Sequence, residues 1–150
     1  AITITYVHMV DINRGWAIGG MKGASDHVFH TQDTGQTWSD VTPPQPAPGA
    51  DSSFPAIGYF KDATSSWVVY GPAEMGAIPP FVYVWRTHDG GATWQYAAVD
   101  TSVSSESFLP LSLTFVGEQN GWLMVALGAG MMVIASRPVN AGGALLGCVQ

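Results

Sequence analysis

Two short segments of the chain share one unusual pattern: TQDTGQTW at residues 31–38 and THDGGATW at residues 87–94. Both read Thr-x-Asp-x-Gly-x-Thr-Trp, and their final tryptophans stand 56 residues apart. A chance recurrence of all these positions is improbable, so the chain contains an internal repeat. The matched residues are Thr31, Asp33, Gly35, Thr37 and Trp38 in the first copy and Thr87, Asp89, Gly91, Thr93 and Trp94 in the second.

The pattern has a mechanical explanation as a tight loop between two antiparallel strands. The short aspartate carboxylate can accept backbone N–H groups, and the glycine can adopt a left-handed conformation. The threonine hydroxyls can bond back to that carboxylate, and the tryptophan can lie over the loop and bury its apolar face. We therefore predict a structural role for these residues and no catalytic role.

A second landmark precedes each copy of the pattern and recurs a third time. It reads NRGWAIGG at residues 13–20, TSSWVVYG at residues 64–71 and QNGWLMVA at residues 119–126. Its tryptophans are Trp16, Trp67 and Trp122, and an aromatic residue that returns once per unit is typical of a repeated core. We predict that all three are packing residues.

Each unit is predicted to form four short strands, because β-branched and aromatic segments alternate with turns of Asp, Asn, Gly and Pro. The expected strands are 2–10, 15–21, 27–31 and 37–41, then 56–60, 66–70, 81–87 and 93–99, then 113–116, 122–127 and 131–136. The segments 42–55 and 100–110 are rich in Pro, Ser and Ala, which indicates surface connections. An all-β domain follows.

The third unit departs from the pattern. Where the third Asp and Trp are due, the chain reads RPVNAGGALLG at residues 137–147, and the best fit sets Asn140 against Asp33 and Leu145 against Trp38. This segment is either a degenerate repeat or a tail. We expect one domain over residues 1–150, with a first unit at about 1–50, a second at about 51–108, and an incomplete or degenerate third at about 109–150.

Composition excludes several classes of protein. The 150 residues are 47% hydrophobic and 11% charged, which argues against disorder, and the net charge of −6 argues against nucleic acid and anionic membranes as partners. The uncharged run at residues 122–135 is shorter than the roughly 20 residues that span a bilayer, so it is predicted to form two strands and a turn, not a transmembrane segment. The opening sequence at Ala1 lacks the features of a signal peptide, so either a signal was removed or the chain is an excised piece.

These patterns resemble the Asp-box (BNR) repeats, which in that family lie between the third and fourth strands of β-propeller blades. MVDINRGWAIGG followed by VFHTQDTGQTW is more specifically similar to the photosystem II assembly and stability factor group and its bacterial, often secreted, relatives. The resemblance implies a partial β-propeller of two to three four-stranded antiparallel blades with Asp-box hairpins. It also implies that a longer parent chain or self-association supplies the remaining blades, in the extracellular space or the cell envelope.

Catalytic and metal sites are not predicted from the residues present. His27 and His30 are three residues apart in a predicted strand and so face opposite sides, and with one cysteine no zinc motif is present, so we expect no metal and no cofactor. In sialidases, which the Asp boxes also resemble, three arginines bind the substrate carboxylate. This chain has only Arg14, Arg86 and Arg137, none of them in the sialidase arginine-Ile-Pro motif.

The predicted function is therefore non-catalytic binding of a protein or a glycan through blade-edge loops. The candidate contact loop is PAEMGAIPP at residues 72–80, with Pro72, Glu74, Met75, Pro79 and Pro80 as contact residues. Two alternatives stay open. The chain could be part of a sialidase-like exo-glycosidase whose catalytic residues lie mostly outside it, or a fragment without independent activity.

Overall fold

The structure is a computed structural model of the 150-residue chain. It describes residues 1–44, 55–71, 81–100, 108–117, 120–127, 130–136 and 145–147. The candidate contact residues of the 72–80 loop, Arg137, Cys148 and most of the degenerate third box lie outside the described residues.

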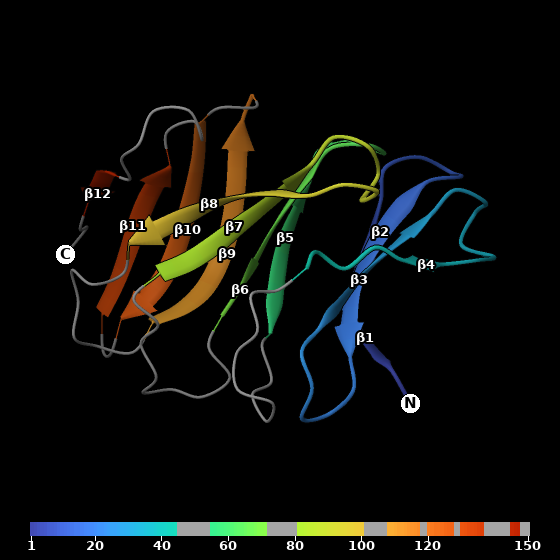
Figure 1. The fold of residues 1–150 in the computed structure, drawn as a ribbon, viewed down its shortest axis with the longest axis horizontal. Coiled ribbons are helices and arrows are strands. Elements are labelled where there is room, and N and C mark those ends of the chain that lie inside the picture. Colours follow the sequence, from blue (N-terminus) through green and yellow to red (C-terminus); the bar gives the residue numbers. More distant parts are fainter. Residues whose placement is uncertain are drawn as a thin grey trace.

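Three four-stranded antiparallel sheets follow one another across the molecule in chain order (Figure 1). The first contains β1 (Thr3–Met9), β2 (Gly15–Gly20), β3 (His27–Thr31) and β4 (Ser39–Asp40). The second contains β5 (Ala56–Phe60), β6 (Ser66–Tyr70), β7 (Phe81–Thr87) and β8 (Gln95–Asp100). The third contains β9 (Phe108–Val116), β10 (Asn120–Leu127), β11 (Gly130–Ser136) and β12 (Leu145–Gly147). Every sheet is a meander in which each strand pairs with the next one along the chain.

The predicted all-β fold is confirmed, and most strand positions agree with the sequence pattern. The uncharged run at 122–135 falls on the paired strands β10 and β11, and the described residues include no helix long and apolar enough to cross a bilayer. In the third unit, β12 pairs with β11 through Leu145–Gly147.

Two parts of the predicted surface connections are wrong. Pro43 is fully buried, and β9 begins at Phe108 rather than at residue 113, with Pro110 buried. The register between β9 and β10 shifts between Met124 and Val125, which pair with Ser112 and Pro110. A proline is accepted here because β9 is an edge strand beside a bulge, where fewer backbone N–H groups are needed for the ladder.

Two hydrophobic clusters hold the sheets together. The cluster between the first and second sheets includes Trp16, Ile18 and Phe60, and the cluster between the second and third includes Trp67, Phe115 and Leu123. Trp16 is fully buried and Trp67 is 2% exposed, as expected of packing residues. The core is thus repeated at each sheet junction rather than gathered in one centre.

Trp122 departs from this expectation, because its side chain is 37% exposed. On the same strand Leu123 and Val125 are buried against the second sheet. Successive residues of a strand face opposite sides, so Trp122 faces away from the second sheet. No described sheet of this chain covers that side, which is why the third tryptophan is not a core residue here.

Candidate functional site

The two Thr-x-Asp-x-Gly-x-Thr-Trp loops have the same hydrogen bonds. In the first, the Asp33 carboxylate accepts bonds from the Thr31 hydroxyl at 3.0 Å, the Thr37 N–H at 2.9 Å and the Thr37 hydroxyl at 2.6 Å. In the second, the Asp89 carboxylate accepts bonds from the Thr87 hydroxyl at 2.8 Å, the Thr93 N–H at 2.9 Å and the Thr93 hydroxyl at 2.5 Å. Each carboxylate therefore ties the two sides of its loop together.

These bonds also determine the protonation of the two aspartates. The Thr93 hydroxyl and N–H, together with the Thr87 hydroxyl, lower the pKa of Asp89 to about 2 from its ordinary value of 3.8. The Thr37 hydroxyl and N–H likewise lower the pKa of Asp33. A general acid at neutral pH needs a raised pKa, so neither carboxyl is suited to donate a proton in catalysis.

The glycine and tryptophan of each loop complete the hairpin but differ in their contacts. Gly35 and Gly91 have positive φ values of 79° and 90°, in the left-handed region. The Trp38 indole donates to the Gly35 carbonyl of its own loop at 3.1 Å and stays 37% exposed. The Trp94 indole instead donates to the Val41 carbonyl, directly after β4, at 2.9 Å, so the second loop also contacts the first unit.

The histidines and arginines of the described residues do not converge on one place. His27 contacts Asp40 through Nδ1 at 2.7 Å, whereas His30 is buried on the opposite side, with its ring centroid 4.4 Å from that of Trp16. Arg14 pairs with Asp11 at 2.6 Å. Arg86 hydrogen-bonds His88 and lies 6.0 Å from the Trp67 ring centroid.

No group of three or more His, Cys, Asp or Glu side chains that could hold a metal ion occurs within the part of the chain that the structure describes. The same part of the chain contains Arg14 and Arg86, which have the separate partners given above.

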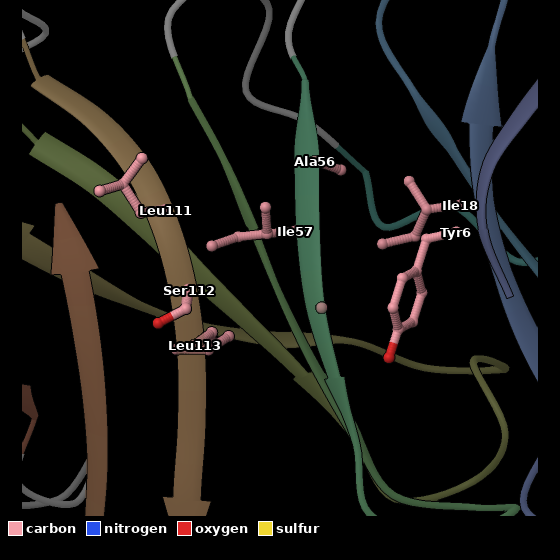
Figure 2. A pocket seen from close by; sticks show the side chains of 8 residues that line it. Tyr6, Ile18, Ala56, Ile57, Leu111, Ser112 and Leu113 are labelled. Atoms are coloured by element: carbon pink, nitrogen blue, oxygen red, sulfur yellow. The ribbon is translucent and has the colours of Figure 1, made fainter. Parts of the chain in front are cut away.

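A cleft of about 260 Å³ is lined by residues of β1, β5 and β9, the first strands of the three sheets, and by Ile18 of β2. Ile57 projects from β5 toward the side chains of β9, while Ala56 projects to the other side of β5, toward Ile18 and Tyr6 (Figure 2). None of the residues that line the cleft is charged. They are Tyr6, Ile18, Ala56, Ile57, Gly58, Leu111, Ser112 and Leu113.

The backbone at this cleft is partly unpaired. β1, β5 and β9 each stand at one end of their sheet, so each has an edge without a neighbouring strand in the described sheets. On β5 the Ala56 N–H bonds the Asp26 carboxylate at 3.0 Å, which secures this strand to the first sheet. A Cβ on Gly58 would lie 2.6 Å from the Phe60 ring, so a larger residue at this point of the cleft wall would require that ring to shift.

The cleft was not predicted from the sequence, which pointed to the 72–80 loop instead. The repeat itself contained a signal for the cleft. Equivalent strands of a repeat lie at equivalent places in the fold, so the first strands of the three units could have been expected to lie near one another. The bulge at Leu111, which leaves this side chain 40% exposed beside the cleft, has no signal in the sequence.

Comparisons with known proteins bear on the fold. No family model matches the chain, and no curated protein matches it either. A solved structure, YCF48 bound to D1 peptide, does match, with a TM-score of 0.62 and 19% sequence identity over 96% of this chain. The chain is a partial β-propeller. It spans 39% of the length of the YCF48 chain, and at this identity the likeness shows the fold alone.

Proposed function

We propose that this chain is a non-catalytic protein-binding module that takes an extended, uncharged peptide segment into the cleft between β1, β5 and β9. The observation that carries the proposal is the combination of an uncharged lining with three strand edges at one place. An extended peptide satisfies both features, since its backbone can bond a free strand edge while its side chains enter the cleft.

The size of the cleft favours a peptide over a small molecule. Its volume of about 260 Å³ is below the roughly 300–1,000 Å³ of small-molecule sites, which also enclose most of their ligand. A cleft of this size accommodates a few side chains of a longer segment. The hydroxyls of Tyr6 and Ser112 supply polar groups that could orient that segment.

The fold comparison supports the same class of function. YCF48 was solved with a D1 peptide, so a protein that shares this fold takes a peptide partner. We extend that class of ligand, and not the particular peptide, to this chain. A location in the cell envelope or the extracellular space, and a contribution of the 72–80 loop to binding, are parts of the same proposal.

In this proposal Asp33 and Asp89, with the threonines, glycines and tryptophans of their loops, hold the hairpins and do not meet the ligand. The lowered pKa values of both aspartates support that assignment over acid catalysis. The exo-glycosidase alternative has no observation in its favour among the described residues, and glycan binding has none either.

The test is selection of peptides from a random decapeptide library displayed on phage, with the immobilised 150-residue chain as bait. We expect enriched peptides to be apolar and uncharged, and to lose at least 10-fold in affinity for Leu111→Glu, which places a charge at the cleft. Tyr96→Glu is the matched control, because Tyr96 is 55% exposed on β8 and does not line the cleft.

Two results would contradict the proposal. One is an enriched set of peptides that binds Leu111→Glu as well as the unchanged chain, because the site would then lie elsewhere. The other is release of a fluorophore from a sialoside by the chain, because turnover would favour the exo-glycosidase.

A further inference from the structure

The free edge of β5 presents a regular row of main-chain groups at the cleft. Directly beside β5, the Gly71 N–H donates to the Pro55 carbonyl at 2.9 Å. Bonded and non-bonded pairs alternate along an antiparallel ladder, so the next odd-numbered residues of β5 also bond β6. The even-numbered residues, Ala56, Gly58 and Phe60, therefore direct their N–H and C=O groups to the free edge.

The Asp26 carboxylate closes this edge at one end. It accepts the Ala56 N–H at 3.0 Å, which agrees with an N–H that points away from β6. An incoming strand cannot receive that N–H, because the carboxylate already does. The open part of the edge is therefore the stretch 58–60, with Gly58 nearest to the cleft.

The equivalent edges of β1 and β9 are interrupted at the same level. On β1 the register shifts between Ile4 and Tyr6, and on β9 it shifts beside Leu111. A bulge breaks the regular spacing of the ladder groups and bends its strand. Pro110 on β9 also has no N–H to donate. Of the three strands, β5 is the one that pairs without a shift, so it offers the regular edge.

The place of β5 in the fold keeps this edge open. The second sheet lies between the first and the third and packs against both (Figure 1). The sheets of a β-propeller stand side by side around a central channel. Further sheets would be added beside the first or the third sheet, and not at the edge of β5. This edge therefore faces the cleft whatever the number of sheets.

A strand paired with β5 would place its side chains in two different halves of the cleft. Gly58 faces the first sheet, because an added Cβ would meet the Phe60 ring and lie 3.2 Å from Ile18 Cδ1. Tyr6 lies in this first half, with its ring centroid 5.9 Å from that of Phe60. Ile57 projects into the second half, toward β9 (Figure 2). Successive side chains of a paired strand alternate between the two halves.

The two halves favour different side chains. In the first half, the residue opposite Gly58 would lie beside Tyr6, which lines the cleft. An aromatic residue opposite an edge glycine covers the backbone that the glycine leaves bare, and two aromatic rings attract each other. In the second half, Ile57, Leu111 and Leu113 provide aliphatic surface. Aliphatic residues therefore fit on either side of the aromatic one.

We infer that the bound segment is a β-strand on the free edge of β5, with an aromatic residue opposite Gly58 and aliphatic residues directly before and after it. Its main chain bonds the Gly58 N–H and C=O groups, as in other cases of strand addition. This inference rests on the proposed function and adds to it the strand that is paired and the order of the side chains.

The first experiment measures amide hydrogen exchange of the 150-residue chain by NMR, with and without a decapeptide from the phage selection. We expect exchange at Gly58 to slow by about 10-fold or more, because a new hydrogen bond protects this amide. Val7 and Leu113 are internal controls. They have on β1 and β9 the register position of Gly58, one residue before the residue opposite the repeated tryptophan. Because their strands are bulged, we expect both amides to slow less than Gly58.

The second experiment replaces the N–H groups of the same decapeptide by N-methyl groups, one at a time. The N–H groups of a paired strand point alternately toward its neighbour and away from it. Around the aromatic residue, every second substitution should therefore weaken binding by about 10-fold, and the ones between them by much less.

The third experiment tests the place of the aromatic residue. Replacing it by alanine in the decapeptide should weaken binding to the unchanged chain more than binding to Tyr6→Ala, because that variant has already lost the facing ring. Equal losses of affinity in the two chains would overturn the pairing of this residue with Gly58.

The outcomes separate this inference from the proposed function. A decapeptide that loses affinity for Leu111→Glu but leaves exchange at Gly58 unchanged overturns the inference alone. Greater slowing at Val7 or Leu113, or N-methyl effects without alternation, overturns it as well. A library without any peptide sensitive to Leu111→Glu overturns both. The exchange and N-methyl measurements use the unchanged chain, so they decide the question even if Tyr6→Ala fails to fold.

Discussion

The Asp89 carboxylate is the best-bonded acceptor of its hairpin, and its titration offers a test of that role. Its pKa in the folded chain is about 2, below the ordinary 3.8, so the folded state binds this proton less readily than the unfolded state. Its contribution to stability is therefore complete above about pH 4 and is lost as the pH falls toward 2. We expect Asp89→Asn to lower the urea midpoint at neutral pH and to have a much smaller effect near pH 2.

This comparison requires urea unfolding curves of both proteins at several values of pH. The same difference between Asp89→Asn and the unchanged chain at every pH would contradict the assignment, because a side chain that does not titrate across this range cannot produce the predicted convergence.

His30 gives a second prediction for a single residue. It is buried between Trp16 and the second sheet, and burial lowers the pKa of its imidazole below the ordinary 6.5. The folded state then binds fewer protons than the unfolded state, so stability is lost as the pH falls below about 6.5. We expect His30→Gln to be less stable than the unchanged chain at neutral pH. We also expect its stability to change less than that of the unchanged chain between about pH 6.5 and 5. Thermal unfolding at these two values measures the slope, and equal slopes would contradict the prediction.

At the level of elements, the hairpin between β7 and β8 presses against the segment after β4. Gly91 has φ of 90°, and an added Cβ would lie 2.6 Å from the Cβ of Val41. Gly23 has φ of 80° with nothing within 4 Å of an added Cβ, which makes it a matched control. We expect Gly23→Ala to cost about 1 kcal/mol for the left-handed backbone alone, and Gly91→Ala clearly more.

Urea unfolding of the two alanine variants provides this comparison. An equal loss at Gly23 and Gly91 would mean that the Val41 contact contributes nothing to the junction between the first and second sheets.

At the scale of the whole molecule, one tryptophan position has different energetic importance in different sheets. Trp67 is 2% exposed between the second and third sheets, so Trp67→Ala should cost about 3–5 kcal/mol. Trp122 is 37% exposed on the last sheet, so Trp122→Ala should cost clearly less than Trp67→Ala. Chemical denaturation measures both losses of stability, and equal losses would contradict the lower energetic importance of Trp122.

The sequence predicted the positions of most strands but not the contacts between sheets. The strand positions followed from local patterns, such as the segment Ser66–Tyr70 between two turns, because turn residues and β-branched runs act on their neighbours. The start of β9 was missed because Pro110 normally indicates a connection, and only its place on an edge strand beside a bulge makes it acceptable.

The candidate cleft could not be predicted from the sequence, because it also depends on contacts between distant segments. Tyr6, Ile57 and Leu111 are more than fifty residues apart in sequence and meet only because three sheets place their first strands together. The pattern of the two Asp-x-Gly-x-Thr-Trp loops is local, because the hydrogen bonds of Asp33 and Asp89 to their threonines span at most four residues.

The sequence by itself determined the repeat, the all-β class and the residues of the two hairpins. These features depend on short-range hydrogen bonds and on the alternation of side chains, which involve residues close together in the sequence. The tertiary structure alone decided which equivalent residues are buried. Trp16, Trp67 and Trp122 are alike in their local surroundings, and they differ because burial depends on whether another sheet stands beside the one that carries them.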